Sequence, residues 1–261
     1  MSFIFDSHAH YDDARFDPDR DMLISSLPEK GVGAVVNAAS DLISSRAAAA
    51  LAEKYSFFWA SAGFHPEAAD HLNDDAMLEI EALTRKERVV AIGEIGLDYY
   101  YDNNPTPESQ RRAFERQLAL AHELDLPVII HSRDAAQETL DIVKKYRPRG
   151  IVHCFSGSAE LAREYTAMGM YVGFTGVVTF KGAKKPLEAA RAAGLSRILI
   201  ETDCPYLAPV PFRGKRCDST MLAYTAQALA EALGVSAQEV IDASFKNALN
   251  VYEIIHNSFK I

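Results

Sequence analysis

Residues 3–10 read FIFDSHAH, an apolar run that passes directly into two histidines. The apolar start is typical of a buried β-strand. Residues two apart on a strand point to the same side, so we expect His8 and His10 to project together. Two imidazoles at this spacing could hold one divalent cation, but His-x-His also occurs in ordinary polar loops. Residues elsewhere in the chain decide between these interpretations.

Short apolar runs alternate with longer helical patterns along the whole chain, without a linker, repeat or low-complexity tract. After the first strand, the apolar runs predict seven more strands, at 34–38, 57–64, 89–94, 126–131, 150–153, 171–174 and 197–201. The periodic segments predict helices at 19–30, 41–55 with Asp41 as N-cap, 75–87, 108–124, 135–146, 158–168, 184–194, 218–233 and 236–254.

This alternation predicts an α/β protein with a parallel sheet. Eight strands favour a single (β/α)₈ TIM-like barrel over an open doubly wound sheet, and 261 residues suit one such domain spanning 1–261. No Gly-x-Gly-x-x-Gly motif follows a predicted strand, which argues against a dinucleotide-binding fold.

Composition excludes several classes of protein. A net charge of −9 and a pI near 5.4 do not fit a basic nucleic-acid coat protein. The three cysteines form no Cys-x-x-Cys motif and predict free thiols in a reducing compartment. The first residues show no basic leader, and no apolar run approaches the roughly 20 residues of a membrane span. We therefore expect a cytoplasmic protein, with nothing in the sequence that demands an oligomer.

Ionisable side chains stand at the ends of six predicted strands. A barrel brings strand ends together at its carboxyl-terminal mouth. One buried histidine is commonplace, but burying so many ionisable groups without a cation would be expensive. The residues are His8, His10, His65, Glu94, His131, His153 and Asp203.

The donor types narrow the metal. Imidazole and carboxylate without thiolate suit Zn²⁺, Mn²⁺, Co²⁺, Ni²⁺ or Fe²⁺, and Mg²⁺ less well. Six or seven ligands exceed what one catalytic ion uses, so two divalent cations sharing one carboxylate fit better. Glu94 is the best bridge, because it has two oxygens and lies on a strand between the other ligand strands.

Six ordered motifs resemble the TatD family of metal-dependent hydrolases, and the resemblance covers essentially the whole chain. They are FDSHAH at 5–10, GFHP at 63–66, GEIGLDY at 93–99, HSR at 131–133, HCFSG at 153–157 and ETD at 201–203. PYLAP at 205–209 and RGKR at 213–216 resemble the family as well.

The resemblance implies an amidohydrolase-like barrel with a two-metal site and deoxyribonuclease activity. By motif, His8, His10, Glu94 and Asp203 would hold one metal, and Glu94, His131 and His153 the other. One place departs from the family: Cys217-Asp218-Ser219 stands where Asn-Glu-Pro is usual.

Three further roles are expected. Asp203 is placed to accept the proton of the attacking water, and His65, outside both metal sets, to contact phosphate or donate a proton. Arg213, Lys215 and Arg216 follow Asp203 closely, and we expect them to bind substrate phosphate.

The expected reaction is hydrolysis of DNA, acting on single strands or strand ends. The same water could instead attack an ester or amide, such as an aminoacyl ester on tRNA, in the manner of a D-aminoacyl-tRNA deacylase. A third hypothesis, a non-catalytic metal-binding partner protein, fits less well because such a role would not require an open two-metal site.

Overall fold

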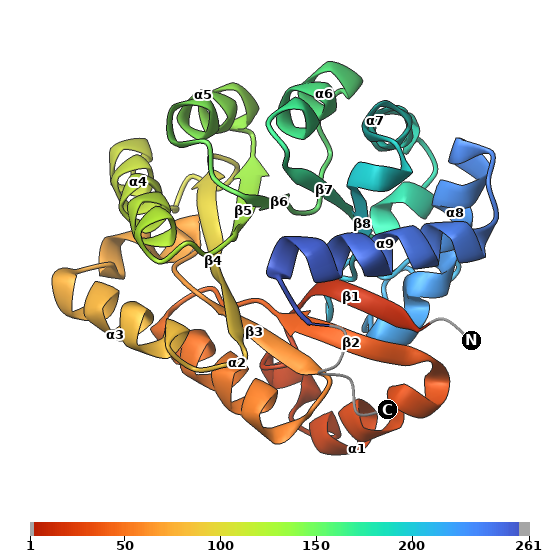
Figure 1. The fold of residues 1–261 in the computed structure, drawn as a ribbon, viewed down its shortest axis with the longest axis horizontal. Coiled ribbons are helices and arrows are strands. Elements are labelled where there is room, and N and C mark those ends of the chain that lie inside the picture. Colours follow the sequence, from red (N-terminus) through yellow and green to blue (C-terminus); the bar gives the residue numbers. More distant parts are fainter. Residues whose placement is uncertain (1–2, 256–261) are drawn as a thin grey trace.

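A computed structural model describes residues 3–255. Its strands form one parallel sheet in the order of the chain, each paired with the next (Figure 1). The strands are β1 (Ile4–Ala9), β2 (Val32–Asn37), β3 (Phe58–Ala62), β4 (Val89–Asp98), β5 (Val128–Arg133), β6 (Gly150–Val152), β7 (Tyr171–Phe174) and β8 (Ile198–Ile200). The predicted (β/α)₈ barrel is confirmed.

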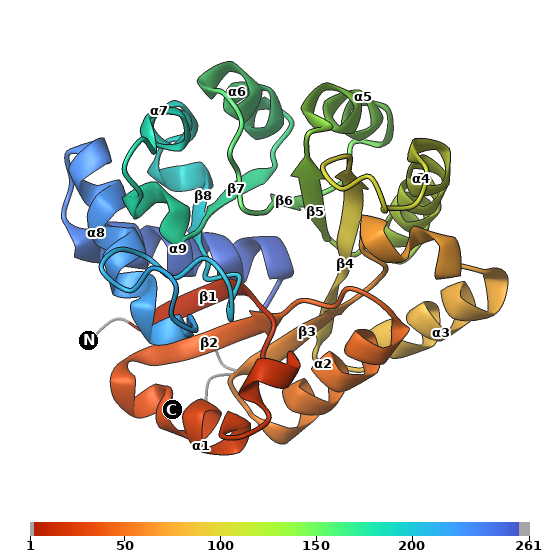
Figure 2. The ribbon, with the colours of Figure 1, turned by 180° about the vertical axis from the view of Figure 1, so that it is seen from behind.

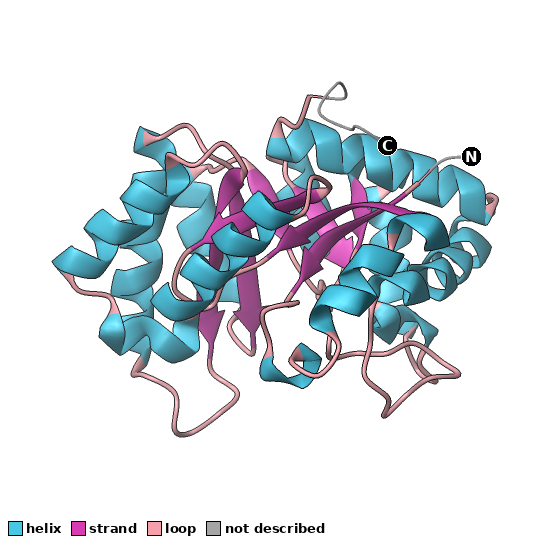
Figure 3. Ribbon diagram, turned by 90° about the horizontal axis from the view of Figure 1, so that it is seen from below, coloured by secondary structure: helices cyan, strands magenta, loops and turns pink. Residues whose placement is uncertain are grey.

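Helices surround the strands on their outer side (Figure 3). Asp41 caps its helix as predicted, with its side chain accepting from the amide of Ser44. None of the helices within residues 3–255 combines the length and apolarity that a membrane span requires. The helices are α1 (Arg20–Ser26), α2 (Leu42–Lys54), α3 (Asp74–Thr84), α4 (Pro107–Glu123), α5 (Ala136–Tyr146), α6 (Ala159–Ala167), α7 (Lys184–Ala193), α8 (Leu222–Leu233) and α9 (Ala237–Tyr252).

Several elements differ by a few residues from their predicted bounds, and two of these differences have a clear physical cause. The helix expected over 19–30 ends at Ser26 and a separate 3₁₀ turn follows at 28–30, because Pro28 has no N–H to continue an α-helix. Strand β4 runs four residues past its expected end and pairs with β5 through Gly96 and His131. A Cβ at position 96 would lie 2.0 Å from the carbonyl oxygen of His131, so only glycine allows this approach.

The barrel closes between its first and last strands without a regular ladder among the described residues. The N–H of Asp203 donates to the carbonyl of His8 at 2.9 Å, and the N–H of His10 donates to the carbonyl of Cys204 at 2.8 Å. The buried carboxylate of Asp6 accepts from the amide and hydroxyl of Thr202. These contacts join β1 to the segment that follows β8 at the mouth of the barrel.

Helix α9 covers the amino-terminal end of the barrel. It lies in front of the strands in Figure 1 and behind them in Figure 2. Val251 and Tyr252 pack against inward-facing side chains such as Phe5 and Trp59, and the Tyr252 hydroxyl donates to the carbonyl of Ser7 at 2.7 Å. With this end filled, the carboxyl-terminal end is where a ligand has room to bind.

Candidate metal centre

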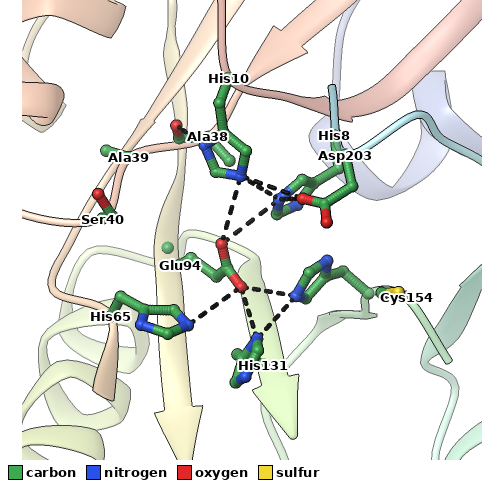
Figure 4. Close-up of polar contacts among 12 residues, drawn as sticks. His8, His10, Ala38, Ala39, Ser40, His65, Glu94, His131, Cys154 and Asp203 are labelled. Carbon is green, nitrogen blue, oxygen red and sulfur yellow. Dashed lines mark hydrogen bonds and ion pairs between the residues drawn. The ribbon is translucent and has the colours of Figure 1, made fainter. Parts of the chain in front are cut away.

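A cavity of about 620 Å³ opens at the carboxyl ends of the strands. Six of the seven predicted strand-end residues line it, and the seventh, His8, is fully buried beside them. Their elements are β1, β4 and β5 and the segments that follow β1, β3, β6 and β8. Figure 4 shows His8, His10, His65, His131 and Asp203 gathered around Glu94.

The two carboxylate oxygens of Glu94 face two different groups of histidines (Figure 4). Oε2 lies 3.4 Å from His8 Nε2 and 3.7 Å from His10 Nε2. Oε1 lies 2.8 Å from His131 Nδ1 and 2.6 Å from His153 Nε2. Buried in the floor of the cavity, this carboxylate separates two clusters of donors.

The first cluster contains His8, His10 and Asp203. The Nε2 atoms of the two histidines are 3.1 Å apart, and Asp203 Oδ1 is 3.2 Å from His10 Nε2 and 3.5 Å from His8 Nε2. Asp203 has a φ of 58°, in the left-handed region that aspartate and asparagine adopt more readily than most residues. This turn directs its carboxylate toward the histidines that follow β1.

Hydrogen bonds behind two histidines determine which nitrogen faces the centre. His10 Nδ1 lies 3.0 Å from the carbonyl oxygen of Ala38, which can only accept, so the ring proton is on Nδ1 and the Nε2 lone pair points inward. His131 Nε2 lies 3.0 Å from Asp98 Oδ2, which places its proton there and leaves Nδ1 facing Glu94. Both rings are oriented as metal ligands are.

This arrangement requires a positive charge. The lone pair of His131 Nδ1 faces Glu94 Oε1 at 2.8 Å and His153 Nε2 at 3.1 Å. Electron pairs so close in a buried site repel one another unless a proton or a metal ion lies between them. The nitrogen and oxygen donors therefore fit a divalent cation of the kind that imidazole and carboxylate bind.

In the metal-free protein, protons on His10 and His131 supply this positive charge. Burial opposes protonation of His10, but Asp203 and Glu94 outweigh it and raise its pKa to about 10. Burial also opposes protonation of His131, and Asp98 and Glu94 raise its pKa to about 9. A cation bound between these groups would replace the protons.

Unlike His10 and His131, His65 directs a protonated ring nitrogen toward the centre. Its Nδ1 accepts the backbone N–H of Glu67 at 3.2 Å, so in the neutral ring the proton is on Nε2. That nitrogen points toward Glu94 Oε1 at 3.7 Å (Figure 4). Burial, reinforced by the nearby His131, lowers the pKa of His65 to about 3 and keeps the ring neutral. His65 therefore presents an N–H donor to the cavity rather than a lone pair.

Three groups of donors have ligand atoms within 4.8 Å of one another in the described part of the chain. One of them, His8–His10–Asp203, is the first cluster, and another, His8–Glu94–His153, joins the two sides through Glu94. The third, His65–Asp98–His131, is the weakest candidate, because Asp98 already accepts the Nε2–H of His131 and His65 directs its Nε2–H toward the cavity.

A family model described as TatD related DNase matches residues 5–253. The chain belongs to the TatD family. It is 40% identical over 254 residues to the uncharacterized metal-dependent hydrolase YabD of Bacillus subtilis, covering 96% of this chain and 99% of that one. It is 39% identical to a 3′-5′ ssDNA/RNA exonuclease TatD of Cronobacter sakazakii, covering 79% and 80% of the two chains.

A solved structure of YJJV, a TatD homolog from Escherichia coli, has a TM-score of 0.90 to this chain at 30% identity. The match covers 97% of this chain and 98% of the other. Together these similarities identify a metal-dependent hydrolase of the TatD family.

The predicted basic substrate residues lie away from the cavity of this TatD-family protein. Arg216 forms two contacts of 2.7 Å with Asp19, and Arg213 lies over the ring of Phe180. Neither these arginines nor Lys215 lines the cavity. Their role in binding substrate stays a prediction, and Arg216 has a clear structural role as an ion-pair partner.

The departure from the usual family sequence is also structural. Asp218 caps the 3₁₀ turn 219–221 by accepting the amide of Thr220 at 2.9 Å. The Ser219 hydroxyl donates to Asp6 at 2.7 Å and lies 2.8 Å from the hydroxyl of Tyr11. Segment 217–219 is thus held against Asp6 of β1, beneath the mouth of the barrel.

Two carboxylates beside the candidate ligands were not among the residues predicted from the sequence. Asp98 orients His131, and Glu201 accepts the amide of Cys154 while lying 3.7 Å from His153 Nδ1. Burial raises the pKa of Glu201 to about 7. Asp98 lies four residues after Glu94 on β4, a spacing that puts strand residues on one face, and this spacing was the available signal for Asp98.

Proposed function

We propose that this protein hydrolyses phosphodiester bonds in DNA from a strand end, using two divalent cations held on the two sides of Glu94. The observation that carries the proposal is the division of the Glu94 carboxylate between the His8–His10 pair and the His131–His153 pair. A buried carboxylate with one oxygen for each cluster is the arrangement that a bridging ligand requires.

The distances support the ligand sets that the family resemblance implies. Asp203, His8, His10 and Glu94 Oε2 would hold the first cation, and His131, His153 and Glu94 Oε1 the second. When bound at such sites, divalent cations polarise phosphoryl oxygens and lower the pKa of water. The exonuclease name of the relatives from Cronobacter supports a nucleic-acid substrate.

The chain's own groups supply proton transfer and orientation. The Asp203 carboxylate is 18% exposed at the cavity surface, so it can accept a proton from attacking water as general base. His65 Nε2–H points into the cavity and would donate a hydrogen bond to a phosphoryl oxygen. Asp98 holds the His131 ring in its orientation.

A substrate panel on metal-reconstituted protein tests this proposal. We expect release of nucleotides from a labelled single-stranded DNA, abolished by a chelator and restored by Mn²⁺ or another divalent ion. Hydrolysis of aminoacyl-tRNA but not of DNA would instead establish a metal-dependent ester hydrolase. The absence of any metal-dependent hydrolysis across the panel would contradict both.

A further inference from the structure

The cavity wall contains little positive charge. Among the described residues that line it, Arg133 is the one arginine or lysine, whereas Asp12, Asp13 and Glu67 add negative charge around the candidate ligands. Attraction between phosphates and basic side chains is therefore a weak source of affinity at this mouth. Something else must bind the rest of a strand whose scissile phosphate lies at the centre.

An exposed tyrosine backed by an arginine lies on one side of the mouth. Tyr206 follows β8, lines the cavity and is 48% exposed. The guanidinium of Arg15 lies 3.9 Å from the centre of its ring, and Asp13 binds Arg15 through two contacts of 3.0 Å. The Tyr206 hydroxyl donates to the same carboxylate at 3.2 Å. Asp13 thus neutralises Arg15 and orients the ring.

A second group of exposed tyrosines beside an arginine lies at the ends of β4 and β5. Tyr101 lines the cavity and is 45% exposed, and its neighbour Tyr100 is 53% exposed. The guanidinium of Arg133 lies 3.6 Å from the ring centre of Tyr100 and 4.9 Å from that of Tyr101. Within residues 3–255, Arg133 forms no ion pair with a carboxylate, and besides lying over these rings it hydrogen-bonds the Tyr101 side chain.

The two groups stand on opposite sides of the candidate metal centre. The sheet runs from β1 to β8 and closes on itself through Asp203 and His8. Tyr206 and Arg15 follow its two joined ends, whereas Tyr101 and Arg133 follow β4 and β5, half a turn around the barrel. An extended chain crossing the mouth would meet one group on each side of Glu94.

We propose that these two tyrosine–arginine groups, Tyr206 with Arg15 and Tyr101 with Arg133, stack unpaired nucleobases on either side of the candidate metal centre. The inference rests on the proposed function for the identity of the polymer. Every base offers an aromatic face, and an arginine behind a tyrosine keeps that ring in place for it. Bases paired and stacked within a duplex do not present these faces, so the ligand is single-stranded nucleic acid.

Equilibrium binding tests the inference separately from catalysis. The ligands are a single-stranded DNA octamer with phosphorothioate linkages, which resist cleavage, and the same octamer with abasic residues at its last three positions. Fluorescence anisotropy with Mn²⁺-reconstituted protein gives the ratio of the two dissociation constants. We expect the complete octamer to bind at least about 25-fold more tightly, because each of the two stacked bases should contribute about fivefold or more.

Variants of the two tyrosines test whether their rings account for the tighter binding of the complete octamer. Tyr206→Ala and Tyr101→Ala should each lower the ratio by about fivefold or more, while Tyr206→Phe, which keeps the ring and loses the hydroxyl, should stay within about twofold of wild type. Tyr224→Ala is the matched control, because Tyr224 is 42% exposed but lies against Phe212, outside the cavity. It should leave the ratio unchanged.

Two results would overturn the inference. One is equal binding of the complete and abasic octamers by the wild-type protein. The other is a loss in Tyr206→Phe as large as that in Tyr206→Ala, which would assign the effect to the hydroxyl bond with Asp13. Because binding is read without cleavage, either result holds whether or not the protein proves to hydrolyse DNA.

Discussion

Asp98 Oδ2 accepts the Nε2–H of His131 at 3.0 Å, and this single contact turns the Nδ1 lone pair of His131 toward Glu94. A carboxylate behind a ligating histidine fixes the tautomer and raises ligand basicity. Asp98→Ala should therefore weaken metal binding by about 10- to 100-fold, measured by titration of the metal-free protein. Glu67→Gln, in the same cavity wall, is the control. Unchanged affinity in Asp98→Ala would contradict the proposed role of His131.

The two clusters around Glu94 predict two metal ions in each chain. Elemental analysis after reconstitution and dialysis should approach two equivalents. His131→Ala combined with His153→Ala should reduce this to about one, because only the second cluster is lost. A metal content of zero in the intact protein, together with activity that resists chelators, would refute the two-ion hypothesis.

The amide substitutions Asp203→Asn and Glu94→Gln should have different effects on catalysis and on metal binding. Asparagine tolerates the left-handed conformation at position 203 and keeps one ligand oxygen, but it cannot accept a proton. Asp203→Asn saturated with metal should lose about 10²–10⁴-fold in kcat with little change in KM. Glu94→Gln should instead lower metal occupancy itself. Near-normal kcat in metal-saturated Asp203→Asn would show that another group is the general base.

His65 should act as a donor and not as a ligand. Loss of one hydrogen bond to a charged phosphate corresponds to about 1.5–3 kcal/mol, so His65→Ala should lower kcat/KM by about 10- to 150-fold. Metal content should remain that of the wild type. A fall in metal content would show that Nε2 coordinates an ion, against the tautomer inferred from the Glu67 contact.

Arg216 should affect stability more than substrate binding. Its ion pair depresses the pKa of Asp19, so the pair stabilises the fold at pH values above about 4, the pKa of an unfolded aspartate, and this stabilisation is lost as pH falls through the depressed value. Arg216→Ala should lower Tm at pH 7, and the difference from wild type should shrink below about pH 4.

Two outcomes separate this role from substrate binding. Asp19→Asn should reproduce the fall in Tm, since it breaks the same pair from the other side. An unchanged Tm in Arg216→Ala, with a weaker salt dependence of DNA binding, would favour the phosphate-binding role predicted for the 213–216 segment.

The barrel was predictable because its strands are buried on both faces and read as apolar runs between helical segments. The end of β4 was not predicted, because Glu94, Gly96 and Asp98 interrupt the continuous apolar run, although buried Ile95 and Leu97 alternate with them and the strand continues by pairing with β5. Helix α1 ends earlier than its periodicity suggests, because Pro28 interrupts a pattern that otherwise continues to residue 30.

The candidate ligands were predictable as a set, because one fold rule brings all strand ends together. Their individual orientations were not. The proton positions on His10, His65 and His131 depend on the carbonyl of Ala38, the amide of Glu67 and the carboxylate of Asp98, and two of these three partners are backbone groups that carry no sequence signal. The substrate-binding role expected of Arg213–Arg216 from their place after Asp203 stays a prediction, because the arginines of this segment contact Asp19 and Phe180 and do not line the cavity.

The junction of β1 with the segment after β8 gives the first candidate metal site an unusual topology. His8 and His10 lie near the start of the chain and Asp203 lies almost two hundred residues later. A cation held by all three would act as a cross-link that closes a very long loop, and long loops lose the most entropy on closure. Metal uptake by a refolding chain should therefore report the moment at which β1 and the segment after β8 come together.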